Sequence, residues 1–192
     1  MTAAAPWDGI VLHYLRAKDH QVPRLFRRVF APDGRFEATW EVGPPFPPTP
    51  PAEGLQAVTE VFRRMGASSE NVLTAVPLDS VAVHGDAMHC TWVVAMTMRH
   101  RPRGMVAWGT YRWTLAHCGT LASELRVCFQ GTSTLSTEAM GPVLDGMAAL
   151  PHPWCERGQL VRALRSLSHV EALQTWLERT ALESALSPQS AA

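Results

Sequence analysis

The feature that most constrains this fold is a two-residue periodicity of apolar side chains between about residues 71 and 130. Side chains point to alternate faces of a β-strand, so this pattern indicates strands that each bury one face. Turn signals at residues 85–86, 99–104 and 117–119 separate three long strands, which predicts an antiparallel meander. The expected inward-facing residues are Met88, Cys90, Trp92, Val94, Met96 and Met98, then Met105, Ala107, Gly109, Tyr111, Trp113 and Leu115, then Leu121, Ser123, Leu125, Val127 and Phe129.

Another strand is predicted before the meander, in the stretch GRFEATWE at residues 34–41. Its alternation places Phe36, Ala38 and Trp40 on one face and two glutamates on the other. Because the apolar face of a strand must be the buried one, we expect the glutamates to point away from the interior.

Three helices are predicted around this strand. Residues 8–19 carry an apolar stripe at helical spacing, with Asp8 as the expected N-cap. A second, short helix ends at residues 32–34, and a third runs over residues 54–65 and stops at Gly66. A curved sheet with one apolar face needs a cover, and we expect these helices to supply it.

The last third of the chain is predicted to be helical, with helices at about residues 138–150, 159–167 and 168–184. The predicted fold is therefore α+β: a curved antiparallel sheet covered by N-terminal helices, with a C-terminal helical extension. The expected division is residues 1–132 for the sheet domain, 133–186 for the extension and 187–192 for a disordered tail.

Composition excludes several classes of function. The 17 acidic and 17 basic residues balance, which argues against a nucleic-acid surface held by net charge. Lys18 is the only lysine, a bias that favours a GC-rich bacterial genome. The chain shows no secretory signal pattern, no membrane span and no cysteine spacing for zinc, so we expect a cytoplasmic protein with free thiols, no metal and no cofactor.

The order of predicted elements resembles the nuclear transport factor 2-like superfamily, which includes ketosteroid isomerase and the SnoaL-like polyketide cyclases. The stretches that carry the resemblance are VLHYLRAKDHQVPRLFRRVFAPDGRFE, GLQAVTEVFRRM, GTYRWTL and LRVCFQ, within about residues 8–131. The resemblance implies that the curved sheet is cone-shaped, with a cavity between the helices and its concave face. It also places the tyrosine of the family's first helix at Tyr14, the isomerase base at Ala38 and the isomerase's protonated acid at Gly109.

The expected ligand site is an apolar pocket with Tyr14 as its polar group. Its predicted lining is Tyr14, Phe36, Trp40, Trp92, Met96, Tyr111 and Trp113. We expect Tyr14 and the tryptophans to converge on a cavity on the order of a few hundred Å³, the usual size of a ligand site. A catalytic base has to reach its proton at hydrogen-bond distance, and Glu37 and Glu41 on the opposite strand face cannot do so. Asp19 is expected to be a cap or a surface charge.

Three functions remain open from these patterns. The first is a protein that binds a hydrophobic small molecule without an evident catalytic base. The second is a lyase or isomerase (a polyketide cyclase, dehydratase or ketosteroid isomerase type) on a hydrophobic substrate, with Tyr14 as the polarising group. The third is a dimerisation or scaffold module. Whether the chain is an enzyme is left open, and neither nucleic acid nor membrane is an expected partner.

The outward face of the sheet carries small, weakly polar residues and one large apolar one, Trp108. Exposed patches of this kind often mark interfaces, and relatives commonly dimerise through this face, so we expect a homodimer. The alternative is that the C-terminal helices fold back over the same face within one chain. The residues at issue are Thr91, Val93, Ala95, Thr97, Val106, Trp108 and Thr110.

Overall fold

The computed structural model describes residues 6–41 and 50–186. The expected tail at 187–192 and most of the proline-rich connection after the first strand lie outside these described residues. Within them, seven strands form one sheet in the order β2-β1-β7-β6-β5-β3, and β4 pairs with β5. The strands are β1 (Phe30–Trp40), β2 (Ala52–Glu53), β3 (Ser69–Ala75), β4 (Ala82–His84), β5 (Ala87–Met98), β6 (Arg103–Leu115) and β7 (Ala122–Ser136).

The predicted meander is present as β5, β6 and β7, which pair antiparallel with turns where the sequence placed them. One pairing differs from the all-antiparallel expectation, because β1 lies parallel to β7. The register sets Phe36 beside Leu125, Ala38 beside Val127 and Trp40 beside Phe129, so the apolar faces of both strands coincide. The sheet is thereby extended around a concave inner face.

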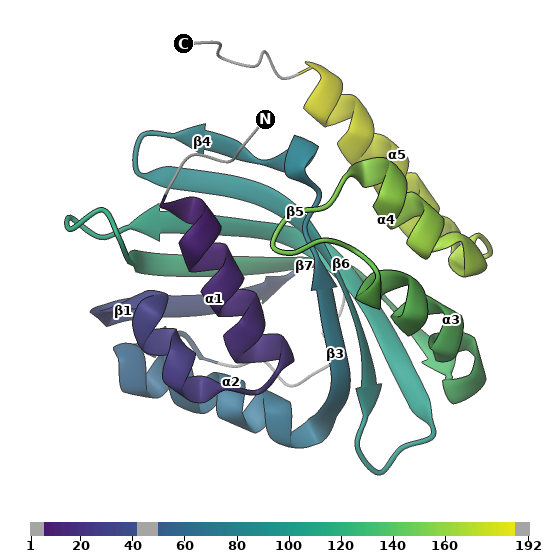
Figure 1. Cartoon of the computed structure of the whole chain (residues 1–192), viewed down its shortest axis with the longest axis horizontal. Helices are drawn as coiled ribbons and strands as arrows, with labels where there is room; N and C mark the ends of the chain where they lie inside the picture. The colour runs from purple at the N-terminus through teal and green to yellow at the C-terminus, as the bar shows by residue number, and fades with distance from the viewer. Residues whose placement is uncertain (1–5, 42–49, 187–192) are drawn as a thin grey trace.

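The N-terminal helices cover this inner face, as predicted. They are α1 (Trp7–Asp19), the 3-10 helix η1 (Pro23–Arg28) and α2 (Leu55–Ser68). Figure 1 shows α1 crossing the front of the sheet and α2 running along its lower side. The inner core, which these helices form with the sheet, contains the rings of Trp92, Tyr111 and Trp113 among its buried side chains.

Three local boundary predictions were wrong. Asp8 does not cap α1, whose N-cap is Pro6. Gly66 lies inside α2, which continues to Ser68. Residues 32–34 do not end a helix but belong to β1, where the register with β7 shifts between Phe30 and Arg35. The turn-forming residues there produce a bulge in a strand, as Pro and Gly often do at a sheet edge.

The strand β7 is longer than predicted and runs through the boundary expected at 132/133. It leads directly into the C-terminal helices, because Ser136 caps the next helix by accepting a hydrogen bond from the Ala139 backbone nitrogen. These helices are α3 (Thr137–Ala148), α4 (Arg157–Ala163), the 3-10 helix η3 (Arg165–Leu167) and α5 (Glu171–Leu186). They lie together on the right in Figure 1, away from α1 and α2.

The C-terminal helices cover part of the outer sheet face, which corrects the prediction that this face is open for a dimer. Trp108 is 2% exposed and packs in a second, outer core with Val93, Val106 and side chains of α3 to α5. The last helix supplies Leu173, Trp176 and Leu177 to this core. Helices of the same chain therefore cover the apolar patch around Trp108.

The Trp108 ring lies over Gly131 of β7, next to a bulge. The register of β6 with β7 shifts between Trp108 and Gly109, which pair with Gly131 and Phe129. A Cβ at Gly131 would overlap the Trp108 indole, so only glycine fits beneath the ring. At the same bulge, Gln130 accepts a 2.8 Å hydrogen bond from Trp176 Nε1 and so ties α5 to the sheet.

Candidate functional site

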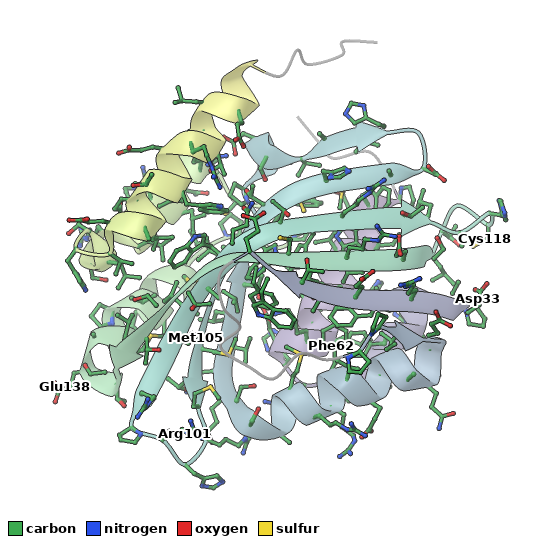
Figure 2. The ribbon with its side chains drawn as sticks, turned by 180° about the vertical axis from the view of Figure 1, so that it is seen from behind. Asp33, Phe62, Arg101, Met105, Cys118 and Glu138 are labelled. Atoms are coloured by element: carbon green, nitrogen blue, oxygen red, sulfur yellow. The ribbon has the colours of Figure 1, made fainter. Side chains whose placement is uncertain are left out.

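A cavity of about 80 Å³ lies between the inner sheet face and the helices α1 and α2. It is smaller than the predicted few hundred Å³, because seven aromatic rings and two methionines fill most of the space around it. Figure 2 shows Phe62 of α2 directed toward the sheet, where its ring lies 4.8 Å from the Phe36 ring. The lining is Tyr14, Lys18, Phe36, Ala38, Trp40, Val61, Phe62, Met65, Trp92, Val94, Met96, Tyr111, Val127 and Phe129.

Six of the seven predicted site residues line this cavity, and Trp113 does not. Trp113 is fully buried behind it, with its ring 5.0 Å from the Tyr14 ring and 6.2 Å from the Phe30 ring. Its position on the inner face was predicted correctly, but it lies near the C-terminal end of β6, beyond the lining of the cavity. Trp113 therefore supports Tyr14 from behind.

Tyr14 is the centre of the aromatic cluster. Its ring makes edge-to-face contacts with Phe62, Tyr111 and Trp113 at centroid distances of 5.0–5.6 Å, the favoured arrangement for aromatic pairs. Burial raises the pKa of Tyr14 and the pKa of Tyr111 well above 10, so both phenols are neutral donors. Tyr111 also acts on the pKa of Tyr14, since its ring lies against the Tyr14 ring and its side chain lowers that pKa in part.

A buried ion pair stands beside the cavity, and sequence reasoning missed it. Lys18 pairs with Asp19 and also donates a 2.6 Å hydrogen bond to Thr74 Oγ1. Asp19 accepts a 2.8 Å bond from the Thr74 backbone nitrogen and a 3.0 Å bond from its hydroxyl. The Asp19 side chain is 3% exposed, so it is neither the cap nor the surface charge that we expected.

Helical spacing could have revealed this pair. Lys18 follows Tyr14 by four residues, and Asp19 follows Leu15 by four, so each lies on the same helix face as a buried residue. Of the two charged groups, only Lys18 lines the cavity. Its Nζ lies 5.9 Å from the centroid of the Tyr14 ring.

No carboxylate or histidine lines the cavity among the described residues. Glu37 points outward, where it lies 3.4 Å from Arg35 and 3.8 Å from Arg126, and Glu41 accepts a 3.0 Å bond from Gln130. The position that the resemblance assigned to a protonated acid is Gly109, and a Cβ there would overlap the Cys128 carbonyl oxygen. An acidic side chain therefore cannot replace Gly109 without moving β7.

Two indole groups at the cavity have unused donors. The Nε1 atoms of Trp40 and Trp92 are buried and have no hydrogen-bond partner among the described residues. Trp40 stacks on Phe129 at 5.4 Å, and Trp92 stacks on Tyr111 at 5.3 Å. A buried donor without a partner costs roughly 1–3 kcal/mol, so these groups favour a ligand or water that brings an acceptor.

The described residues contain no group of three or more His, Cys, Asp or Glu side chains placed to hold a metal ion. All four cysteines are free thiols. Over residues 6–41 and 50–186, no helix is both long enough and apolar enough to cross a membrane.

Comparison with known proteins gives a family match and many structural matches. A profile of the SnoaL-like domain matches residues 9–120. No curated protein sequence matches the chain. Among solved structures, an NTF2-like protein from Burkholderia pseudomallei is similar, with a TM-score of 0.55 and 14% identity over 67% of this chain and 92% of that chain.

Two further structures share the fold. A protein with a ketosteroid isomerase-like fold from Catenulispora acidiphila, in complex with trimethylamine, has a TM-score of 0.52 and 16% identity over 63% of this chain and 85% of that chain. A candidate polyketide cyclase from Acidithiobacillus ferrooxidans has a TM-score of 0.51 and 13% identity over 70% of this chain and 91% of that chain. At these identities the likeness concerns the fold.

Proposed function

Because the chain belongs to the SnoaL-like domain family, we propose that it binds a compact, hydrophobic small molecule in the inner cavity without transforming it through a protein base. The observation that carries the proposal is the lining: apolar and aromatic walls with a few convergent polar groups, the usual composition of ligand sites. The similar structure from Catenulispora acidiphila holds trimethylamine, which is also a compact molecule. We place the protein in the cytoplasm, where free thiols are the ordinary state of cysteine.

The size of the cavity limits the ligand. A volume of about 80 Å³ is well below the 300–1,000 Å³ of sites for larger ligands. Met65 and Met96 line the cavity, and their unbranched side chains adapt readily to a new neighbour. A single aromatic ring is therefore the largest body that we expect to enter without rearrangement of the sheet.

The alternative is a lyase or isomerase in which neutral Tyr14 polarises a substrate carbonyl. The neighbouring phenol of Tyr111, whose ring centroid lies 5.6 Å from that of Tyr14, favours it, because a second phenol can support charge that develops on an oxygen bound to the first. The similarity to a candidate polyketide cyclase also agrees with it. Among the described residues no carboxylate or histidine lines the cavity to accept a proton, so we expect no isomerisation of a steroid ketone by the unmodified protein. A scaffold role would require a filled interior.

Binding can be tested through the intrinsic fluorescence of Trp40 and Trp92, with single-ring aromatic compounds as ligands. Ala38→Leu should abolish saturable quenching, because a larger side chain at this lining position fills the cavity. Thr39→Leu is the matched control: the neighbouring residue lies on the outer face and is exposed, so binding should persist. Failure of every ring compound to bind, or equal binding by both variants, would contradict the proposal.

A further inference from the structure

The polar groups of the cavity share one property: they can donate hydrogen bonds. They belong to Lys18, Trp40, Trp92, Tyr14 and Tyr111, all of which line the cavity. The phenols can also accept, but burial keeps both neutral, so neither carries a negative charge. No carboxylate, amide or imidazole among the described residues faces the same space. The complementary ligand carries an acceptor.

Lys18 is the only one of these donors with a full charge, and its neighbours fix its position. An ammonium has three N–H donors, and Asp19 and Thr74 take two of them. The third has no acceptor among the described residues. Because two bonds hold the ammonium beside the Tyr14 ring, a ligand does not have to order a freely rotating lysine, which lowers the entropic cost of binding.

The ion pair is oriented with its positive end toward the cavity. Lys18 lines the cavity and Asp19 does not, since the Asp19 carboxylate is turned to the backbone and hydroxyl of Thr74. The Lys18 side chain is 12% exposed and the Asp19 side chain is 3% exposed, so Lys18 is the more accessible member of the pair. An anionic group bound by Lys18 lets an attached ring enter the aromatic interior.

We infer that the cavity takes a small aromatic carboxylate, with its carboxylate bound by Lys18 and its ring among the aromatic side chains. This inference rests on the proposed function and specifies the chemical class of its ligand. A hydrogen bond from an ammonium to a carboxylate is about twice as strong as a neutral one, so the charge should dominate the choice among rings of equal size. Trp40 and Trp92 supply further donors that a hydrocarbon ring would leave unsatisfied.

Three ring compounds of nearly equal size separate the possibilities: benzoate, benzyl alcohol and benzylamine. With the full chain, titration by tryptophan fluorescence or calorimetry should show benzoate binding about tenfold more tightly than benzyl alcohol, and benzylamine binding most weakly. If none of the three binds, the proposed function itself fails. If all three bind equally, the cavity binds rings and the assignment of the carboxylate is wrong.

Variants of the ion pair give the second arm of the test. Lys18→Met should reduce the preference for benzoate over benzyl alcohol to less than about twofold, since the charged donor is lost. Lys18→Met combined with Asp19→Asn avoids a buried unpaired carboxylate and should behave in the same way. Asp19→Asn alone keeps the cation and its bond to Thr74, so the preference for benzoate over benzyl alcohol should persist even though the ammonium is held less firmly. Retention of the benzoate preference without Lys18, or its loss in Asp19→Asn, would overturn the inference.

Discussion

The indole Nε1 of Trp154 donates a 2.7 Å hydrogen bond to the Asp8 carboxylate, which joins the segment between α3 and α4 to the first turn of α1. The Trp154 ring also packs against the inner core. The C-terminal part of the chain therefore contacts the helix that carries Tyr14 and Lys18, in addition to its own core on the other side of the sheet.

This hydrogen bond can be measured by a double-mutant cycle. Trp154→Phe keeps an aromatic ring and removes the donor, so the free energy of unfolding should fall by about 1 kcal/mol. Asp8→Ala should cost a similar amount, and the double variant should cost less than the sum of the two. Urea denaturation gives the three values. A coupling energy near zero would mean that the bond contributes nothing in solution.

Substitution of Gly131 tests the bulge under Trp108. Gly131→Ala should destabilise the protein by at least about 2 kcal/mol, because the new methyl group overlaps the indole and the surrounding β-sheet cannot easily move aside. Gly9→Ala is the control: Gly9 lies in α1 with no atom near its missing Cβ, and alanine there should be neutral or stabilise by up to about 1 kcal/mol. Thermal denaturation of both variants is sufficient, and equal melting temperatures would contradict the described register.

Trp108 decides between an intrachain cap and a dimer. Since the indole is buried under α3 to α5, Trp108→Ala should cost about 3–5 kcal/mol, whereas Arg112→Ala on the same strand and face should cost little because Arg112 is exposed. Light scattering after size exclusion should show the unmodified chain as a monomer. A dimer that Trp108→Arg dissociates without loss of stability would restore the homodimer prediction.

The two tyrosines, Tyr14 and Tyr111, are the only ones in the chain, so tyrosinate absorbance reports on the cavity alone. Burial raises the pKa of each above its ordinary value near 10, so the folded state keeps both protons where the unfolded state releases them. Their contribution to stability is complete below about pH 10 and declines as the pH rises further. In an alkaline titration, tyrosinate absorbance should increase together with loss of circular dichroism. Ionisation at a pH where the fold is intact would contradict this burial.

The inward and outward faces of the strands could be predicted from sequence, because apolar and polar residues alternate along each strand. Phe36, Trp92 and Tyr111 lie inward as expected, since any other register would expose large rings to water. The parallel pairing of β1 with β7 could not be predicted in this way, because alternation gives the face of a strand and not its neighbour. The position of the C-terminal helices depends on the six residues by which β7 exceeds its expected end at Gln130.

The aromatic lining of the cavity was predicted, but its volume and the presence of a charged group were not. Its volume depends on how closely side chains such as Met96 and Phe62 interlock, which no periodicity encodes. Asp19 was expected to be a cap or a surface charge, and no position was predicted for Lys18. Asp19 is buried and Lys18 is largely buried, because Thr74 on a distant strand bonds to both. Helical spacing could have placed the pair on buried faces of α1, but a partner so far away in sequence leaves no local signal.

The strands β5, β6 and β7 separate two hydrophobic interiors, with Trp92 on one side and Val93 on the other. Only this single layer of strands lies between the two interiors. Loss of the helices on either side would therefore expose one apolar face of these strands to water. Partial opening is therefore costly, and amide hydrogens in these strands should exchange only when the whole chain unfolds. The family profile ends at residue 120, before β7 begins, whereas the smallest piece that can keep both interiors dry extends into α5. The family profile therefore covers a shorter part of the chain than the two hydrophobic interiors together.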